Sequence, residues 1–293
     1  MKKLLFAICG VVIFAGCKEH GTSLDFGSNL ISQTTYVASP VPRAEAHQVL
    51  VEEFTGQSCP NCPAAHVLLD TMSSQNPGRI NVISMYTIGG PVNDPPNGAQ
   101  YDFRDAAALN ILNEIYGGST PLPATGADRV SDNGSMLSLG AQSLSGPVTS
   151  RLIVADSVNL LVTSSYNVSK NIATITAAVT FTQAFSTPQN LSIVVVEDSI
   201  NDLQEFPGDV QSYWFMDVFR GMVTSVPAGD VLQVSANSNT KVAGRVFQKV
   251  YSYVLPAKSP VIVPAHCRVI AFVNTANGAD KHVLQSAQCK LVP

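Results

Sequence analysis

The sequence predicts two folded parts, an α/β unit over residues 45–150 and an antiparallel β-sandwich over residues 151–293. In the first part, strand-like runs alternate with helix-like runs, which is typical of an α/β arrangement. In the second part, apolar and polar residues alternate along several short runs bounded by turn signals, which indicates antiparallel strands. The charge distribution supports this boundary, because the first part is strongly acidic and the second is nearly neutral.

The composition of the 293 residues excludes several classes of protein. Hydrophobic residues make up 45% of the chain, enough to bury a core, and charged residues make up 13%. Lys and Arg total 17 against 21 Asp and Glu, with no basic run after Lys2 and Lys3, so we expect no nucleic-acid partner. After the first sixteen residues, no apolar run reaches the roughly 18–20 residues that a membrane-spanning helix needs. A multi-span membrane protein is therefore excluded.

The N-terminus predicts export and lipidation. A short basic start precedes an apolar stretch over residues 4–15, which ends in the run Phe-Ala-Gly-Cys at Cys17. This run resembles a bacterial lipobox, where the leader is cut before the cysteine and the cysteine then receives lipid such as palmitate. We expect a signal peptide over residues 1–16 and an anchor at Cys17 that holds stably through more than one acyl chain. An ordinary signal peptide with a chance cysteine is the alternative, and Lys18 favours the outer membrane by analogy.

The elements of the α/β unit follow a polar segment without periodicity. Residues 17–44 are rich in Ser, Thr, Gly and Pro, and we interpret them as a lipidated tether. Apolar residues recur at helical spacing between residues 102 and 116, which predicts an amphipathic helix. The expected elements, in order, are a strand over 47–54, a helix over 63–72, a strand over 80–86, a helix over 102–116 and a strand over 124–130.

The C-terminal part begins with a predicted hairpin. Apolar residues alternate with threonines over residues 172–182, a period of two that indicates a half-buried strand. A turn at Ser169-Lys170 would place the apolar residues of both strands on one face. The expected pairs are Tyr166 with Ala173, Val162 with Ala177, and Val158 with Phe181. Further strands are expected over 191–198, 245–255, 260–264, 267–274 and 282–291, and the aromatic run over 213–216 is expected in the sandwich core.

The motif with the clearest chemistry is the pair Cys59 and Cys62, which follows a predicted strand and a Thr-Gly turn and opens a predicted helix. Backbone N–H groups and the helix dipole stabilise a thiolate on the first cysteine of such a pair. The second cysteine, one turn further on, can attack a mixed disulfide and release the partner. This arrangement predicts thiol–disulfide exchange, with Cys59 as the attacking thiol and Cys62 as the resolving thiol.

The stretch around this pair resembles the thioredoxin superfamily over residues 45–150. Glu53 stands six residues before Cys59, where those proteins keep a buried acid that exchanges protons with the second cysteine. The resemblance therefore implies that Glu53 is the proton acceptor. A second mark of the superfamily is a cis-proline loop that faces the cysteine pair and shapes the substrate groove. Pro121 and Pro123 are both candidates, and Pro123 is favoured because a predicted strand follows it directly.

A narrower resemblance covers nearly the whole chain. It rests on the lipobox, the tether, the run Glu-Glu-Phe-Thr-Gly-x-x-Cys-x-x-Cys-Pro-Ala that begins at Glu52, and a proline-to-arginine run that ends at Arg129. The C-terminal runs Ala271-Phe272-Val273 and Val283-Leu284-Gln285 extend it. In these features the chain is similar to the outer-membrane-protein-28 related family. That similarity implies an outer-membrane lipoprotein with a thioredoxin-like domain, and it indicates architecture and location more than chemistry. The expected substrates, thiols or disulfides of other exported proteins, follow from the cysteine pair.

A non-catalytic envelope lipoprotein is the competing hypothesis. Pro63 removes a backbone donor near the first helical turn, and a helix capped by Cys62 would leave Cys59 outside the turn. No lysine lies between Lys18 and Lys170, and nearby carboxylates disfavour a thiolate. Under this hypothesis the cysteine pair is an inert disulfide, and an immunoglobulin-like sandwich binds a protein or glycan partner.

The remaining cysteines of the mature chain, Cys267 and Cys289, are predicted to form a structural disulfide, as an even cysteine count in an exported protein suggests. Asn277-Gly278 is a turn signal, and a hairpin centred on Gly278 would place the two cysteines opposite each other. Two free buried thiols are the alternative.

No other group of residues predicts chemistry. Cys59, Cys62 and His66 could offer ligands to a metal ion, but the sequence provides no evident fourth ligand. The glycine-rich loop over residues 89–98 has no phosphate-binding pattern, and no Ser-His-Asp arrangement stands out. We therefore expect no metal and no cofactor.

Overall fold

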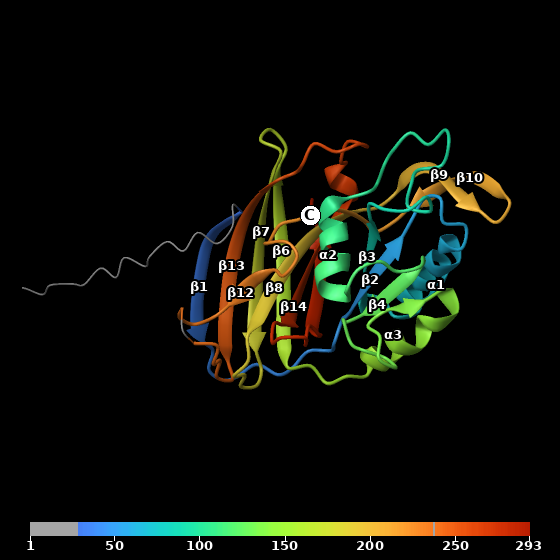
Figure 1. Ribbon diagram of the computed structural model, residues 1–293. Helices are drawn as coiled ribbons and strands as arrows, with labels where there is room; N and C mark the ends of the chain where they lie inside the picture. The colour runs from blue at the N-terminus through green and yellow to red at the C-terminus, as the bar shows by residue number, and fades with distance from the viewer. Residues whose placement is uncertain (1–28, 237) are drawn as a thin grey trace, which may run out of the picture.

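The structure, a computed structural model, describes residues 29–236 and 238–293 (Figure 1). The predicted signal peptide over residues 1–16, the lipidation site Cys17 and the first part of the tether lie outside the described residues. Within the described ranges, the strands form a nine-stranded mixed sheet, a four-stranded antiparallel sheet and a two-stranded hairpin. Across these same ranges, no helix is long and apolar enough to cross a membrane.

The helices and strands have the following bounds. The helices are α1 (Cys62–Gln75), α2 (Ala106–Tyr116) and α3 (Ser145–Leu152), with 3-10 turns at Ala141–Ser143 and Pro264–His266. The strands are β1 (Leu30–Val37), β2 (Val49–Thr55), β3 (Ile80–Tyr86), β4 (Ala124–Ala127), β5 (Ser138–Leu139), β6 (Val158–Asn167), β7 (Ile172–Phe181), β8 (Gln189–Glu197), β9 (Ile200–Phe206), β10 (Asp209–Phe215), β11 (Val218–Met222), β12 (Asp230–Leu232), β13 (Arg245–Val254), β14 (Cys267–Thr275) and β15 (Val283–Lys290).

The larger sheet joins strands from both parts of the chain, in the order β15-β14-β8-β11-β3-β2-β4-β5 with β12 beside β8. β2 pairs in parallel with β3 along its full length, and β11 also runs parallel to β3. β4, β8, β14 and β15 pair antiparallel with their neighbours. The sheet thus runs across residue 150, where composition and charge change, and that boundary stays a prediction.

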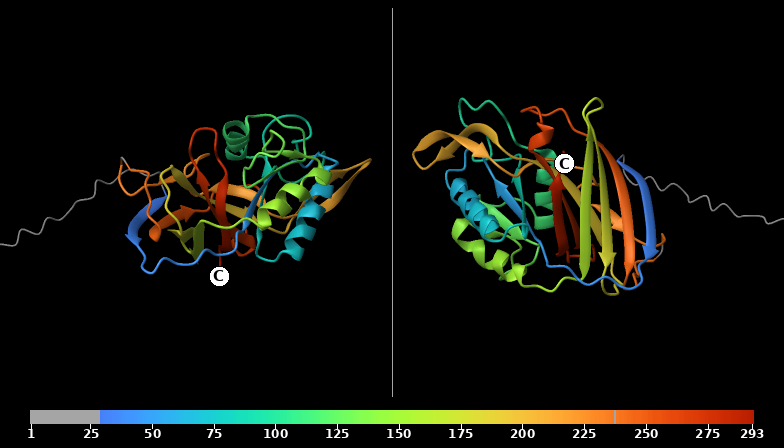
Figure 2. Two further views of the ribbon diagram at one scale, coloured as in Figure 1. Left: turned by 90° about the horizontal axis from the view of Figure 1, so that it is seen from below. Right: turned by 180° about the vertical axis from the view of Figure 1, so that it is seen from behind.

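Helices cover both faces of the β2–β3–β4 part of this sheet (Figure 2). On one face, α1 and α3 share a core with β2 through Leu69, Val148 and Val51. On the other face, α2 shares a core with β2 through Ile111 and Phe54. Because both faces are covered, every residue of β2 and of β3 is buried.

The smaller sheet, in the order β1-β13-β7-β6, packs against the β8–β14–β15 part of the larger sheet. The hairpin of β6 and β7 has the predicted register, with Val158 opposite Phe181 and Val162 opposite Ala177. Its alternating apolar residues point into the core between the two sheets, and that part of the prediction is confirmed. The broader prediction, a mixed α/β sheet with parallel strands together with antiparallel sheets, is confirmed as well.

Part of the predicted tether is a strand instead. Residues 30–37 form β1, which pairs antiparallel with β13 at the edge of the smaller sheet. Seven of its eight residues are exposed, so the strand is held through main-chain hydrogen bonds rather than by burial of an apolar face. A polar sequence without periodicity gives no signal for such an edge strand.

Two further segments differ from the sequence prediction. Residues 260–264 do not form a strand, because prolines at both ends of the segment cannot donate to a ladder. The aromatic run over residues 213–216 lies in β10 and the loop after it, outside the sandwich core. There the side chain of Phe215 is buried, whereas Trp214 is 62% exposed. The hairpin of β9 and β10 projects from the sheet near the start of α1 (Figures 1 and 2).

Candidate functional site

Cys59 and Cys62 form a disulfide at the junction between β2 and α1, with their Cα atoms 5.4 Å apart. The helix begins at Cys62, and Asn61 stands at its cap position without a side-chain hydrogen bond. Cys59 lies in the preceding turn, where the N–H of Cys62 donates to its carbonyl oxygen. The first cysteine is therefore outside the helix, as the position of Pro63 suggested, and gains less from the helix dipole than a cysteine inside the first turn.

The β9–β10 hairpin covers this disulfide. The N–H of Glu205 donates to the carbonyl oxygen of Gln57 over 2.8 Å. The side-chain amide of Gln204 donates to the carbonyl oxygens of Gly56 and Cys59 over 3.3 and 3.1 Å. Cys59 is 2% exposed and its partner is fully buried. A segment more than 140 residues away in the chain thus closes over the cysteine pair.

Glu53 lies beneath the start of α1, on the opposite face of β2 from Glu52. Its Oε2 accepts a hydrogen bond from the hydroxyl of Ser84 over 3.1 Å. Its Oε1 makes no hydrogen bond within the described residues and lies 3.5 Å from Nε2 of His66. Burial raises the pKa of Glu53 to about 8, so this carboxyl group carries a proton at neutral pH.

His66 lies one helical turn after Cys62 and faces Glu53. Its Nε2 is 3.0 Å from the hydroxyl of Thr55, and its Nδ1 is 3.1 Å from the hydroxyl of Tyr213. Burial lowers the pKa of His66 to about 4, so the imidazole is neutral at pH 7. A neutral imidazole has one nitrogen that donates and one that accepts, and can therefore pass a proton between its two partners.

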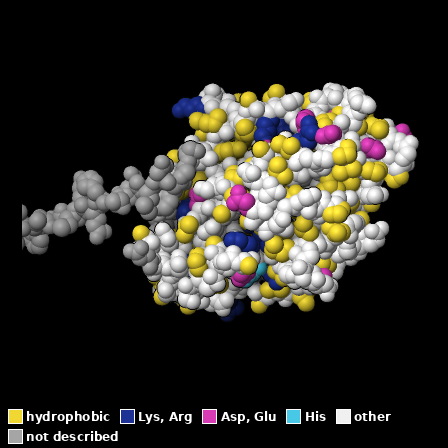
Figure 3. All heavy atoms as spheres, viewed as in Figure 1, with side chains coloured by type: hydrophobic (Ala, Val, Ile, Leu, Met, Phe, Trp, Pro, Cys, Tyr) yellow, Lys and Arg dark blue, Asp and Glu magenta, His cyan; other side chains and the backbone are white. Residues whose placement is uncertain are grey.

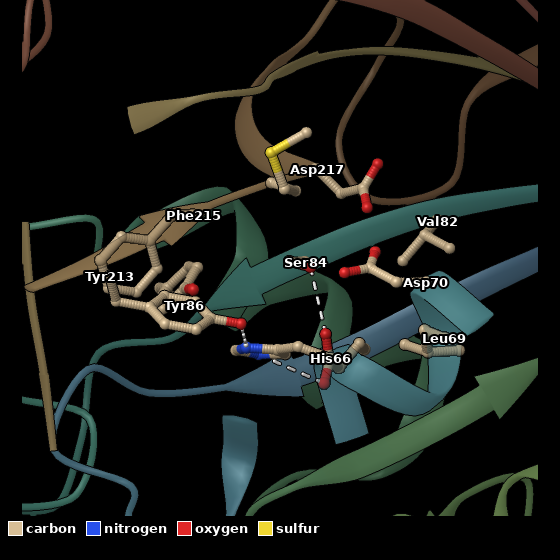
Figure 4. A pocket seen from close by; sticks show the side chains of 11 residues that line it. His66, Leu69, Asp70, Val82, Ser84, Tyr86, Tyr213, Phe215 and Asp217 are labelled. Atoms are coloured by element: carbon tan, nitrogen blue, oxygen red, sulfur yellow. Dashed lines mark hydrogen bonds and ion pairs between the residues drawn. The ribbon is translucent and has the colours of Figure 1, made fainter. Parts of the chain in front are cut away.

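A small cavity of about 20 Å³ adjoins these side chains, enough for one water molecule. Asp70 and Asp217 also line it, and both raise the pKa of Glu53 further through like-charge repulsion (Figure 4). Asp217 itself pairs with Arg268, yet its burial raises its pKa to about 6. The site therefore holds protons more firmly than exposed carboxyl groups do.

Pro123 precedes β4, and the Leu122–Pro123 peptide bond is cis, as expected for this proline rather than for Pro121. The next residue, Ala124, pairs with Phe54 at the end of β2 that leads to the cysteine pair. The structure thus joins the strand of Pro123 to the strand of Glu53. Whether Pro123 contacts a substrate stays a prediction.

The charges on the opposite face of β2 are paired. Glu52 accepts two hydrogen bonds of 2.7 Å from the guanidinium of Arg129 and one of 2.5 Å from the hydroxyl of Tyr116. Arg129 stacks over the ring of Phe272, 4.8 Å from its centroid. Figure 3 shows few charged side chains on the visible surface, and pairs such as this one are buried instead. Two adjacent glutamates therefore have different environments: one is ion-paired and the other is not.

The predicted Cys267–Cys289 disulfide is absent, and both residues are free thiols. In the structure Val269 lies opposite Cys289, and the N–H of Leu291 donates to the carbonyl oxygen of Cys267. The expected pairing of Cys267 with Cys289 is thus displaced by two residues. The physical reason is the connection between β14 and β15, where a register irregularity next to Val273 moves the hairpin centre away from the predicted one.

Sequence reasoning missed the partners that complete the site. His66 was considered only as a metal ligand, although its position four residues after Cys62 predicts the same helix face. Tyr213 and Gln204 come from the β9–β10 hairpin, which was not predicted from the sequence. Among the described residues, no group of three or more His, Cys, Asp or Glu side chains is placed to hold a metal ion.

Comparisons with known proteins give a family and a fold. Residues 112–292 match the family model described as outer membrane protein Omp28. The solved structure of HBP35 of Porphyromonas gingivalis superposes with a TM-score of 0.63 at 14% identity, over 85% of this chain and 77% of that one. At this identity the likeness shows the fold alone.

Two further solved structures are more distant. A protein of Agrobacterium tumefaciens has a TM-score of 0.48 at 16% identity, over 84% of this chain and 96% of that one. A domain of the outer membrane lipoprotein Omp28 from Porphyromonas gingivalis has a TM-score of 0.31 at 15% identity, over 47% of this chain and 90% of that one. No curated protein matches the chain.

Proposed function

The chain belongs to the family of outer membrane protein Omp28, and on that premise we propose that its Cys59–Cys62 pair exchanges disulfides with exported proteins at the outer membrane. The family is one of outer membrane lipoproteins, so we further propose that Cys17 carries the lipid anchor and that residues 1–16 are removed. The proposed substrates are thiols or disulfides of other exported proteins, because an exported cysteine pair meets such partners.

The observation that carries the proposal is the buried carboxyl group of Glu53, on the strand that leads to the cysteine pair and 3.5 Å from His66, which lies one helical turn after Cys62. Without an ion-pair partner, a buried carboxyl group costs stability, and it has no packing role that an apolar side chain could not fill. A proton donor with a pKa near the working pH is what cleavage of a disulfide needs, because the leaving thiolate must be protonated. The pKa of about 8 for Glu53 meets that requirement.

The proposed reaction balances as follows. A substrate thiolate attacks Sγ of Cys59, the Cys59–Cys62 bond breaks, and its electron pair goes to Sγ of Cys62. The carboxyl group of Glu53 supplies the proton that converts this thiolate to a thiol. A second substrate thiolate then attacks the substrate sulfur of the mixed disulfide and releases Cys59. The substrate leaves as a disulfide, and the protein pair is reduced by two electrons.

Access to the pair requires movement of the β9–β10 hairpin, since Cys59 is 2% exposed beneath it. The hairpin is held over the pair by the hydrogen bonds of Glu205 and Gln204. Further contacts come from Asp202, which accepts from the N–H groups of Gln100 and Tyr101, and from Tyr213, which contacts His66. The outer strand β10 is largely exposed, so local opening costs less than unfolding of the whole sheet. The proposal therefore includes an opening step before exchange.

We propose that residues 45–150 form a thioredoxin-like domain and residues 151–293 an immunoglobulin-like sandwich. The parallel β2–β3 pair, the helix after the cysteine pair and the proline before β4 support the first assignment. The two facing sheets around one core support the second. Pro123 would then shape the substrate groove of the first domain.

A second candidate function rests on the burial of the pair. A disulfide that is 2% exposed at Cys59 and fully buried at Cys62 also suits a structural bond in a non-catalytic lipoprotein. In that case the β-sandwich would bind a protein or glycan partner, and the Cys59→Ser/Cys62→Ser variant would keep that binding.

The reduction potential of the Cys59–Cys62 pair separates the two functions. The full chain in detergent is equilibrated with glutathione buffers, and thiols are counted by alkylation and mass spectrometry at these two positions. A potential between about −120 and −270 mV supports exchange, and a pair still oxidised below about −300 mV supports the structural bond. In cells, Cys62→Ser should trap mixed disulfides, while Cys59→Ser serves as the matched control that traps none.

A further inference from the structure

We propose that His66 and Tyr213 form the proton path that connects the buried Glu53 to the surface. This inference rests on the proposed exchange function of the cysteine pair and adds two residues to it. His66 comes from α1 and Tyr213 from the β9–β10 hairpin, so the hairpin would take part in proton transfer as well as cover the site.

The geometry gives a continuous path. Oε1 of Glu53, which has no hydrogen-bond partner within the described residues, is 3.5 Å from Nε2 of His66. Nδ1 of His66 is 3.1 Å from the hydroxyl of Tyr213. The two imidazole nitrogens therefore face the two ends of the path (Figure 4). The side chain of Thr55 contacts the same Nε2 over 3.0 Å and fixes the ring at the inner end.

The outer end of the path is held by aromatic packing. The ring of Tyr213 meets those of Phe206 and Phe215 edge to face, with centroids 5.9 and 5.0 Å apart. Tyr213 and His66 are each half-buried, so the path ends where the protein meets solvent. Among the described residues, the other side chains around Glu53 include Ser84 and Tyr86 from β3 and two carboxyl groups.

The other titratable groups around Glu53 come from α1, from β3 and from the residues after β10. Asp70 on α1 and Asp217 after β10 repel a negative charge on Glu53, and Asp217 is itself paired with Arg268. Tyr86 on β3 lines the same cavity, and burial raises its pKa well above the ordinary value, so it stays protonated. Tyr86 also packs against Phe215 of the hairpin, with ring centroids 6.1 Å apart, whereas His66 contacts the hairpin through a ring nitrogen that can carry a proton.

The proton balance uses the exchange reaction already described. After Glu53 gives its proton to Cys62, its carboxylate takes the Nε2 proton of His66. His66 takes the hydroxyl proton of Tyr213 at Nδ1, and Tyr213 regains a proton from water. The imidazole has then changed tautomer, and a turn of the ring or return transfer restores it. No redox partner beyond the substrate dithiol is needed.

The test is the pH profile of repeated turnover, in which the full chain oxidises dithiothreitol while oxidised glutathione reoxidises the Cys59–Cys62 pair, measured per thiolate from pH 5.5 to 9. A single reduction uses only the proton that Glu53 already holds, so the path contributes when Glu53 must change its protonation between turnovers. For the unaltered chain we expect a rate constant that falls above about pH 8, where Glu53 loses its proton. Tyr213→Phe should lower the rate constant at least about 10-fold below that pH, because general acid catalysis contributes about 100-fold or more. Tyr101→Phe, in the same aromatic cluster, is the matched control and should retain the unaltered rate.

The outcomes separate this inference from the function beneath it. A reduced rate for Tyr213→Phe and for His66→Gln, with an unchanged reduction potential for Tyr213→Phe, supports the path. A Tyr213→Phe profile that matches the unaltered chain overturns the path and leaves the exchange function standing. An unaltered chain that dithiothreitol reduces only on unfolding overturns both. If His66→Gln does not fold, Tyr213→Phe decides alone, since it removes a single oxygen.

Discussion

Replacing Glu53 by glutamine should stabilise the folded protein at neutral pH, although it removes the proposed proton donor. Glutamine has nearly the same shape, can accept the hydrogen bond from Ser84 and can donate toward His66. It carries no charge at any pH. The variant therefore isolates the cost of keeping an ionisable group in this buried position.

The magnitude follows from the pKa of Glu53, which burial raises from 4.5 to about 8. Between these values the folded chain holds a proton that the unfolded chain has lost, so folding takes up a proton. The free energy of unfolding then falls as pH rises, by about 1.4 kcal/mol per pH unit. This contribution of Glu53 to the free energy of unfolding is fully present below pH 4.5 and has been lost at pH 8. At pH 7 the glutamine variant should be more stable by about 3 kcal/mol.

The assay is urea unfolding followed by circular dichroism at pH 5, 6, 7 and 8, with the Cys59–Cys62 disulfide intact. The difference between Glu53→Gln and the unaltered chain should widen with pH, while contributions of other titrating groups largely cancel. Glu52→Gln is the matched control at the next residue. It should lower stability by about 3–5 kcal/mol, because it leaves the buried Arg129 without its partner. Parallel stability curves for Glu53→Gln and the unaltered chain would refute the argument.

Three further predictions test other contacts. Arg129→Met should lower the free energy of unfolding, measured in urea, by about 3–5 kcal/mol. Adding Glu52→Gln should recover most of this loss, because no buried carboxylate is then left without its partner. Equal losses in the single and double variants would contradict this. Gly56→Ala would place a Cβ against the carbonyl oxygen of Val92 in the facing loop, closer than van der Waals contact allows. It should lower the free energy of unfolding by about 1–3 kcal/mol, again measured in urea. Burial raises the thiol pKa of Cys267 to about 12 and that of Cys289 to about 11, so peptide mapping after alkylation at pH 8 should find both modified only upon unfolding; a label-resistant pair in the unfolded chain would instead indicate a disulfide.

Local patterns in the sequence determined the elements that bury one face or both. The alternation around Ala173 was sufficient for the register of β6 with β7, because a slip of one residue would turn the apolar side chains to solvent. The mostly apolar run at 80–86 likewise predicted β3 with its bounds. Elements held by backbone pairing alone, such as β1, left no such pattern and were missed.

The residues of the candidate site likewise divide into those that the sequence predicted and those that only the structure shows. Spacing within one strand and helix was enough to propose Cys59, Cys62 and Glu53, since these residues are close in sequence and their relation is set by local geometry. It could not show that Tyr213 and Gln204 close over them, because that contact joins segments about 150 residues apart and depends on the path of the whole larger sheet.

The sequence by itself predicted export, and it determined the cysteine motif, the alternation of strands and helices, and the family resemblance. The tertiary structure decided the protonation of the site. Adjacent glutamates in one strand point to opposite faces, and only packing shows that Glu52 meets Arg129 while Glu53 meets a neutral histidine. Desolvation and distance to a counter-charge set a pKa, and both are properties of the folded chain that residue order does not contain.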